Sequence, residues 1–510
     1  MKLKYILFLS SLVVASSFYL LQPTQVRSSA DTLSLGWENA PRSYDPRYAV
    51  DANSQYLEGL LHCSLMTSNA DGNLAKDLAR SWEWKSGTHL VMKIRSDLTF
   101  ADGTPVTLND VKKTYDFFLK KSNSRPSPRA LAFRKIKEIK IADESLHFIL
   151  KEPDASFLSN LVVGILPESL SSKGLITQKT QVKGCGFFVH KKSTLNEITL
   201  EKRKDREFKT KNNISFVKIK IVKDPTTRFA KLRKGELDIV QNTIGYQKIS
   251  TIDRYKELKV VKSPALKTSY LGFNLRNPLL KNLKVRQAIA HAIDKKAIID
   301  FVLKGFATEA KSMLPSTHDY YSPVMTEYSY NPDFSNKLLD EAGFPLKGHS
   351  RFDLTITLTN NSTRLSISKV LANNLKKIGI NLRIRTVEWG KFKKDVEKGV
   401  VDIWLLTWIG YKDPDIYRYA FSTGSFPPNG GNRGWYSNSH LDSLLERGLK
   451  TSDISERKKI YQEVSSLVTK DLPYVFLFHE NNYAVMRNNV KNFKLFADGH
   501  YSSLVGVEKL

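Results

Sequence analysis

The sequence predicts an α/β protein with two lobes of similar design. One pattern of strand, helix, glycine and strand occurs twice, as VKIKIVKDPTTRFAKLRKGELDIV (217–240) and NLRIRTVEWGKFKKDVEKGVVDIW (381–404). The junctions also agree, since RKGELDIV in the first unit matches EKGVVDIW in the second. With 510 residues, 41% of them hydrophobic, the chain is long enough for two or more domains with large cores. Two such units favour two α/β lobes, and the alternative is coincidence between two ordinary units.

The first unit is predicted from its alternating apolar and polar residues and from the residues that begin and end its helix. Residues 217–221 alternate apolar side chains with lysines, as a half-exposed strand does. Asp224-Pro225-Thr226 supplies the capping chemistry of a short helix, and Gly235 ends that helix. A second strand follows over 237–240.

The second unit and the segment before it follow the same rules. Residues 382–386 alternate apolar side chains with arginines, a helix follows, and Gly399 precedes a strand over 401–404. Before this unit, DLTITLT (353–359) alternates as a strand, and Ser362 or Thr363 can cap the next helix. The helix predicted between the two units covers 284–305 and ends at Gly305.

The first 30 residues have the pattern of a secretory signal. Lys2 and Lys4 precede an apolar run over 6–21, and Ser28-Ser29-Ala30 offers small residues to a signal peptidase. We therefore expect export with cleavage after Ala30. The alternative is an uncleaved membrane anchor, for which the apolar run is short. No cysteine follows the run closely, so a lipoprotein is not predicted.

The chain is strongly basic, with a formal net charge of +28. Such a balance is typical of proteins that bind nucleic acid or anionic surfaces. Here the basic residues are spread along the chain without a basic tail, which favours a solvated basic surface. No nucleic-acid-binding module is recognisable, and export argues against such a partner.

The two cysteines, Cys63 and Cys185, lie far apart in the sequence. They can pair in an oxidising compartment or remain as two buried thiols, and spacing alone does not decide between these. No CxxC motif and no cluster of histidines is present, so no metal site is predicted.

The segment TWIGYKDPDIY (407–417) is the best candidate for an active site in the sequence, because it contains two carboxylates. Asp413 and Asp415 flank a proline, however, and an Asp-Pro pair most often starts a turn. No GxSxG, HExxH, P-loop or complete dinucleotide loop is present. We therefore predict a binding protein with no catalytic residues and no cofactor, and a hydrolase that uses the two carboxylates is the less favoured alternative.

Several segments, in order along the chain, together resemble a known family. They are Asp45-Pro46, LAKDLARSWEWKSGTHLVMKIRSDLTFADGTPVTLNDVKKTYDF (74–117), LGFNLRNPLLKNLKVRQAIAHAIDKKAII (271–299) and RGWYSNSHLDSLLERG (433–448). This ordered set resembles the family 5 extracellular solute-binding proteins, which include the oligopeptide-, dipeptide- and nickel-binding periplasmic proteins of ABC importers. The resemblance covers nearly the whole chain after residue 30.

The resemblance implies a periplasmic-binding-protein fold of class II, of the large cluster C type. Lobe 1 would contain residues 31–265 and 481–510, with a subdomain inserted at about 50–165. Lobe 2 would contain residues 266–480. A ligand would lie between the lobes, and the protein would act as a monomer that delivers it to the permease subunits of an ABC transporter.

The resemblance also implies ligand-binding residues. The pocket tryptophans fall at Trp389 and Trp408, while Tyr270, Asn432 and Tyr483 lie near other ligand-contacting segments. Peptide-binding members have an aspartate three residues after the second tryptophan, where it pairs with the ligand's terminal ammonium. That position is Tyr411 here, so either Asp413 takes the role or the ligand has no free amine there.

Together these observations predict the exported substrate-binding component of an ABC importer, with a peptide or similar small solute as its ligand. The alternative from another class is an envelope or chaperone-like protein on the same fold that binds anionic polymers through its basic surface.

Overall fold

The computed structural model describes residues 30–120, 127–171, 175–177, 180, 183–205 and 213–510. The predicted signal peptide, residues 1–30, lies outside the described residues except for Ala30. None of the described helices combines the length and the hydropathy that are needed to span a bilayer.

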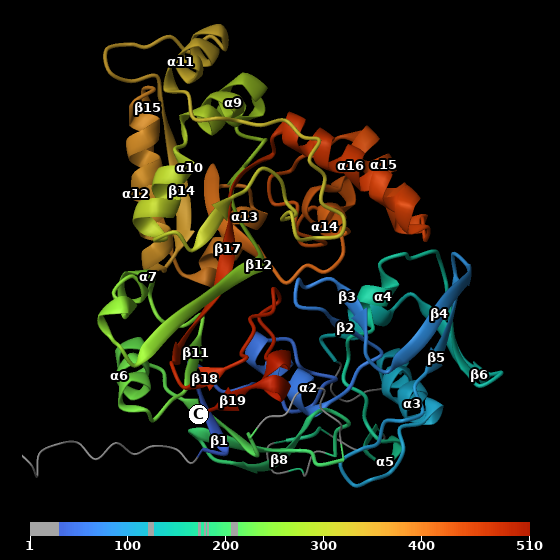
Figure 1. The fold of residues 1–510 in the computed structure, drawn as a ribbon. Helices are drawn as coiled ribbons and strands as arrows, with labels where there is room; N and C mark the ends of the chain where they lie inside the picture. The colour runs from blue at the N-terminus through green and yellow to red at the C-terminus, as the bar shows by residue number, and fades with distance from the viewer. Residues whose placement is uncertain (1–29, 121–126, 172–174, 178–179, 181–182, 206–212) are drawn as a thin grey trace, which may run out of the picture.

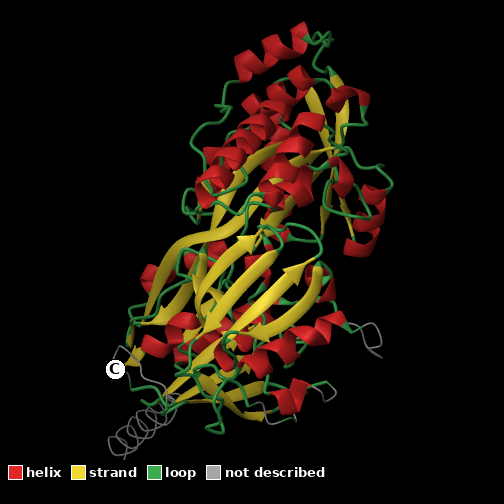
Figure 2. Ribbon diagram, turned by 90° about the vertical axis from the view of Figure 1, so that its right-hand side faces the viewer, coloured by secondary structure: helices red, strands yellow, loops and turns green. Residues whose placement is uncertain are grey.

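A single eleven-stranded sheet runs through both lobes (Figures 1 and 2), in the order β15-β14-β16-β12-β17-β11-β1-β10-β9-β8, with β13 paired to β17. Two long strands, β12 (Leu258–Phe273) and β17 (Tyr474–Arg487), belong to both lobes. Lobe 1 contributes β1 (Thr32–Trp37), β8 (Phe188–Ser193), β9 (Glu197–Lys202), β10 (Phe216–Ile221) and β11 (Ile239–Gln241). Lobe 2 contributes β13 (Ala307–Glu309), β14 (Phe352–Thr359), β15 (Ile380–Val387) and β16 (Ile403–Ile409).

The two predicted strand–helix–strand units have the same topology. In lobe 1, β10 and β11 flank β1, and all three strands are parallel. In lobe 2, β15 and β16 flank β14, again in parallel. The helices of the two units are α6 (Pro225–Lys234) and α13 (Trp389–Glu397). The prediction of two α/β units of like construction is therefore confirmed by the strand pairing.

Most of the predicted helix ends agree with the structure. The Asp224 carboxylate accepts a hydrogen bond from the Thr227 amide at 2.7 Å, and Gly235 takes the left-handed conformation, φ 79°, at the end of α6. In α12 (Ser362–Lys376) the cap was wrongly predicted, because Asn361 accepts the bond from the Arg364 amide. The single helix predicted over 284–305 is divided at Ile293, since Asp294 caps a new turn through the Ala297 amide.

Helices cover both faces of the lobe 2 sheet (Figure 1). One face packs on α9, α11 and α12, and the other on α13 to α16, in two separate apolar cores. The lobe 2 helices not yet given are α8 (Pro278–Lys281), α9 (Leu283–Ala292), α10 (Lys295–Ala297), η3 (Ile298–Val302), α11 (Pro332–Glu341), α14 (Ile416–Phe421), η4 (Thr423–Ser425), α15 (Ser439–Lys450) and α16 (Ile454–Asp471).

Lobe 1 has its own core, which includes residues from both ends of the chain. Its remaining elements are α2 (Ala52–Leu61), α7 (Tyr246–Ile249), η2 (Ile252–Arg254), β18 (Val490–Lys491), η5 (Ser502–Gly506) and β19 (Glu508–Lys509). A further core belongs to a subdomain built on an antiparallel sheet of order β4-β5-β7-β6. Its elements are β2 (Met66–Ser68), β3 (Leu74–Lys76), β4 (Ala79–Ser86), β5 (His89–Ile94), α3 (Leu108–Leu119), η1 (Ala130–Phe133), β6 (Ile136–Ala142), β7 (Ser145–Leu150), α4 (Phe157–Asn160) and α5 (Glu168–Ser171).

A disulfide joins Cys63 to Cys185 and fastens the end of α2 to the segment GCGFF (184–188). This decides between the two alternatives that the sequence left open. The flanking glycines allow the close approach, because a Cβ atom on Gly184 would lie 1.8 Å from the Leu61 carbonyl oxygen. The bond closes a loop with a sequence separation of 122 residues.

Replacing both cysteines by alanine should therefore destabilise the protein. Without the cross-link the unfolded chain gains conformational freedom, so we expect the free energy of unfolding to fall by about 2–5 kcal/mol. Chemical denaturation with and without a reductant measures this. The reductant should lower the stability of the wild type and leave the double variant unchanged; equal stability of all samples would contradict the prediction.

Candidate functional site

The main cleft is a cavity of about 1420 Å³ whose walls come from lobe 1, the inserted subdomain and lobe 2. Its lobe 1 side is formed by α2 and residues 496–505. The subdomain contributes residues around 66–77, 128–135 and 154–164, and lobe 2 contributes residues 410–429. The lobe 2 part contains most of the segment TWIGYKDPDIY, so that segment forms one wall of the cleft.

The cleft walls are tied together at several points. The side-chain amide of Asn73 donates to the Thr317 carbonyl oxygen, and its oxygen accepts from the Asp319 amide, both at 3.1 Å. On another side, the Ala155 amide donates to the Leu449 carbonyl oxygen at 2.7 Å. These bonds join the subdomain to lobe 2, so the structure has the two lobes in contact around the cleft.

Tyr411 lines the cleft, but its hydroxyl is already used. The side chain is 6% exposed, and its hydroxyl hydrogen-bonds with the Thr268 hydroxyl and donates to the Met313 carbonyl oxygen at 3.1 Å. Burial raises the pKa of Tyr411, so the phenol stays neutral. Tyr411 is therefore a wall residue with no negative charge to offer a ligand.

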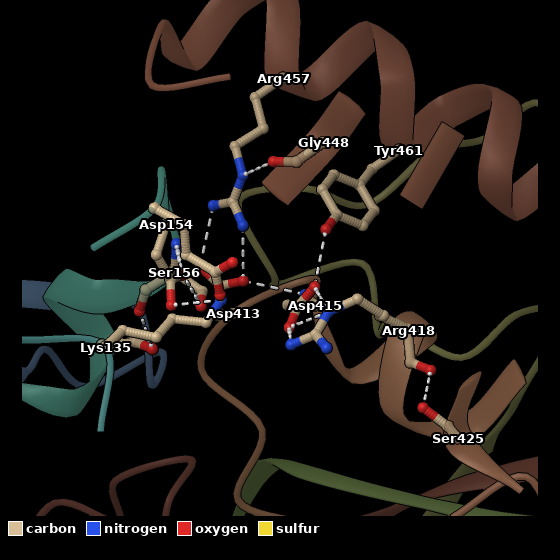
Figure 3. Close-up of polar contacts among 12 residues, drawn as sticks. Lys135, Asp154, Ser156, Asp413, Asp415, Arg418, Ser425, Gly448, Arg457 and Tyr461 are labelled. Atoms are coloured by element: carbon tan, nitrogen blue, oxygen red, sulfur yellow. Dashed lines mark hydrogen bonds and ion pairs between the residues drawn. The ribbon is translucent and has the colours of Figure 1, made fainter. Parts of the chain in front are cut away.

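Asp413 and Asp415 also line the cleft, and each is held by a different arginine (Figure 3). Arg457 forms a bidentate pair with Asp413 at 2.8 and 2.7 Å. The Arg418 guanidinium binds Asp415 through its Nε atom at 2.8 and 3.0 Å. Burial raises the pKa of Asp415, although Arg418 opposes that shift. Neither carboxylate is free in the way that an acid–base pair of a hydrolase requires.

The two predicted pocket tryptophans lie at the carboxyl ends of β16 and β15, where ligands bind in open α/β sheets. Trp408 is half-buried, with Tyr270 at 5.9 Å between ring centroids and Tyr419 at 5.8 Å. The Arg433 guanidinium lies 5.1 Å from the Trp408 ring centroid. Trp389 is 52% exposed and stacks on Phe392. Both tryptophans keep exposed ring surface, but neither lines the main cleft.

The other three predicted residues are in the protein core. Tyr270 is 1% exposed and stacks on Tyr474 at 4.1 Å. Asn432, also 1% exposed, holds a turn by donating to the carbonyl oxygens of Phe421, Ser422 and Tyr436. Tyr483 is buried and donates to the Ile244 carbonyl oxygen at 2.5 Å. These contacts leave their side chains little surface for a ligand.

Sequence reasoning missed several polar groups of the cleft. Lys412 of lobe 2 forms an ion pair with Asp498 of lobe 1 at 3.3 Å. Glu58 of α2 accepts two bonds from Arg129 of the subdomain, at 2.9 and 3.0 Å. No local sequence pattern could have shown these pairs, because their members come from distant segments. Sequence reasoning also missed exposed Tyr419, which lies two residues after the segment TWIGYKDPDIY.

Within the part of the chain that the structure describes, no group of three or more histidine, cysteine or carboxylate side chains is placed to hold a metal ion. The cleft geometry is thus that of a large, partly open site with both polar and apolar walls, which suits a small solute.

Comparison with known proteins agrees with this geometry. The model of the family described as bacterial extracellular solute-binding proteins, family 5 (middle), matches residues 73–428. The chain belongs to this family. Since the family consists of binding proteins and not of enzymes, the prediction that the chain is not an enzyme is confirmed.

Relatives of this family 5 protein match along most of the chain. The oligopeptide-binding protein AppA of Bacillus subtilis is 27% identical over 486 residues, which are 91% of this chain and 88% of the relative. The solved structure of AppA in complex with a nonapeptide matches with a TM-score of 0.72 at 25% identity, and the match covers 94% of this chain and 99% of that one. NikZ from Campylobacter jejuni in complex with Ni(L-His) gives a TM-score of 0.76 at 25% identity, with coverage of 94% and 100%. The predicted two-lobed fold is confirmed by these structures.

Stability of this family 5 protein should fall in acid because of His62 in the cleft wall. Burial lowers the pKa of His62 to about 4, against about 6.5 in an unfolded chain. Between pH 4 and 6.5 the unfolded state binds more protons than the folded state, so the free energy of unfolding falls as the pH decreases. A contribution of about 3 kcal/mol, which is fully present above pH 6.5, is lost as the pH falls towards 4.

Urea denaturation at several pH values between 7 and 4 tests this. The pH dependence should be shallower in a His62→Gln variant than in the wild type. Burial also lowers the pKa values of His318 and His479, so part of the slope should remain. An identical slope in both proteins would contradict the assignment to His62.

The ion pair between Arg457 and Asp413 should matter for stability. Arg457 is 4% exposed on its side chain, and its Nε atom donates to the Gly448 carbonyl oxygen at 2.9 Å. An Arg457→Met variant leaves the Asp413 carboxylate without its charge partner, which should cost about 3–5 kcal/mol. The double variant with Asp413→Asn should recover much of that loss in thermal denaturation. If it recovers none, the lost stability does not come from the stranded charge.

Proposed function

We propose that this protein is the exported, periplasmic substrate-binding component of an ABC importer. It captures a peptide or similar small solute between its lobes and delivers it to permease subunits in the membrane. The observation that carries the proposal is the cleft of about 1420 Å³, walled by both lobes and by the inserted subdomain. Such a site removes water from a ligand on several sides and makes occupancy depend on closure.

The pairing of β12 with β17 supports the proposed boundary between the lobes. In lobe 1 the two strands pair in one register up to Pro264 and Asn481. The register shifts before the next pair, Thr268 with His479. A change of angle between the lobes therefore needs backbone adjustment at few residues. We place the hinge at 264–268 and 479–481, close to the proposed division at 265/266 and 480/481.

The relatives support a solute of the peptide type without fixing its identity. Their names include an oligopeptide-binding protein, a heme-binding protein and a dipeptide-binding protein. For this chain we propose that Tyr411, Asp413 and Tyr419 form the lobe 2 wall of the ligand site. Trp408 lies next to Tyr419 and Trp389 follows a neighbouring strand, so we propose that both border the same site. We expect the binding protein to act as a monomer.

Native mass spectrometry of freshly purified protein tests the proposal directly. We expect a fraction of the protein to carry a co-purified solute, which fragmentation then identifies. Adding that solute should change the intrinsic tryptophan fluorescence and reduce the radius of gyration measured by small-angle X-ray scattering. Folded protein with neither a bound solute nor a response to peptide, metal-chelate and sugar panels would contradict the proposed function.

A Tyr419→Ala variant should bind the identified solute about tenfold more weakly, since it removes an exposed aromatic surface from the cleft. Tyr330 is the matched control. It is 40% exposed on lobe 2, lies outside the cleft, and its hydroxyl accepts a bond from Lys377. A Tyr330→Ala variant should keep wild-type affinity in isothermal titration calorimetry. Equal losses in the two variants would indicate an effect on folding and not on binding.

A further inference from the structure

The cleft contains six carboxylates in the described part of the chain, and their partners determine which ligand charges can enter. They are Glu58, Asp77, Asp154, Asp413, Asp415 and Asp498. A ligand with a free ammonium group needs one of them as an uncommitted negative partner, because an unpaired ammonium that leaves water is costly.

On the side of the cleft shown in Figure 3, three carboxylates are neutralised by the protein itself. Asp413 has its bidentate pair with Arg457, and Asp415 is held by Arg418. Across the cleft, Asp154 of the subdomain lies 3.2 Å from the Lys135 ammonium and accepts bonds from Ser156. Each carboxylate therefore has a positive partner without any ligand.

The three other carboxylates also have partners in the protein. Glu58 of lobe 1 accepts two bonds from Arg129 and a third from the Gly164 amide at 2.8 Å. Asp77 of the subdomain accepts from the Ser64 amide at 2.7 Å, and the pKa of Arg95 is raised by Asp97 and also by the charge of Asp77. Asp498 is 4% exposed on its side chain and receives an ammonium from the other lobe, that of Lys412.

Lys412 is important for ligand charge because its ammonium group lies in the cleft where we propose that the ligand binds. It follows Tyr411 directly in the cleft wall, and its ammonium reaches across the cleft to Asp498, where the His500 amide also donates at 3.0 Å. A ligand ammonium at this place would have to displace Lys412 and leave a partly buried lysine unpaired. The protein therefore already supplies the positive charge that an amine ligand would bring.

The basic residues of the cleft are less completely paired. Arg95, Arg129, Lys135, Lys412 and Arg418 each have a carboxylate partner. Within the described residues, Lys76 and Arg134 also line the cleft, and neither forms an ion pair there. The charge left for a ligand is thus positive.

We propose that the cleft takes a neutral or anionic solute that has no free ammonium group, such as a peptide whose N-terminus is acylated. This inference rests on the proposed function and names the chemical class of its substrate. The cleft excludes free amines because every strong negative partner in it is already held. It accepts a carboxylate or another anionic group near Lys76 or near Arg134.

Two peptides that differ only in the amine test the inference. Isothermal titration calorimetry compares Ala-Ala-Ala with N-acetyl-Ala-Ala-Ala on the full chain freed of bound solute. We expect the acetylated form to bind at least tenfold more tightly. Equal or tighter binding of the free amine would overturn the inference and leave the proposed function intact, because a ligand has then been bound.

If neither peptide binds, the solute identified by native mass spectrometry decides. A co-purified solute without a free ammonium group supports the inference, and one with such a group overturns it. If no solute is found and nothing binds, the proposed function fails, and the inference falls with it.

A Lys412→Met variant tests the mechanism of exclusion. Removing the ammonium leaves Asp498 free, so binding of Ala-Ala-Ala should become at least tenfold tighter relative to the acetylated peptide. Lys311→Met is the control, since it breaks an ion pair with Glu327 on lobe 2, outside the cleft, where both side chains are about half exposed. An unchanged preference in Lys412→Met, or the same change in both variants, would overturn the role assigned to Lys412.

Discussion

The antiparallel pairing of β12 with β17 is the constraint on which the rest of the structure depends. Each strand passes through both lobes, so each lobe completes its sheet on the same two strands, through β11 in lobe 1 and β16 in lobe 2. Pro264 has no amide hydrogen to donate, and the register shifts between it and Thr268. The connection is therefore continuous in covalent structure, and its strand pairing is irregular at the hinge that we propose between the lobes.

This arrangement explains why charged side chains of the cleft pair with one another in the absence of a ligand. Its walls come from α2, the subdomain, the loop after β16 and the segment after β17, and they meet only when both lobes are in place. Ion pairs such as Lys412 with Asp498 therefore form between the lobes and connect them in this structure. A ligand must add to an existing set of pairs, so its own charges decide whether closure is favoured or opposed.

The sequence was sufficient for local structure and insufficient for the roles of single side chains. Periodicity and glycine positions predicted the two strand–helix–strand units, because those signals are local. Core and wall aromatics could not be separated, since β12 and β16 are covered on both faces and Tyr270 and Trp408 occur in equally apolar runs. The partner of Asp413 is Arg457 of α16, which lies 44 residues further along the chain, so spacing gave no sign that this carboxylate was already neutralised.

The net positive charge of the chain does not by itself show which ligand charge the cleft prefers. A formal charge of +28 suggests an open cationic site, yet five of the cleft's lysines and arginines are paired with carboxylates. Most of the excess charge therefore lies outside the cleft. At physiological ionic strength such charges act over about 8 Å, so they affect the encounter with anions more than the choice among bound solutes. That choice depends on the local pairs around Lys412 and on the two cations, Lys76 and Arg134, that remain without carboxylate partners in the described cleft.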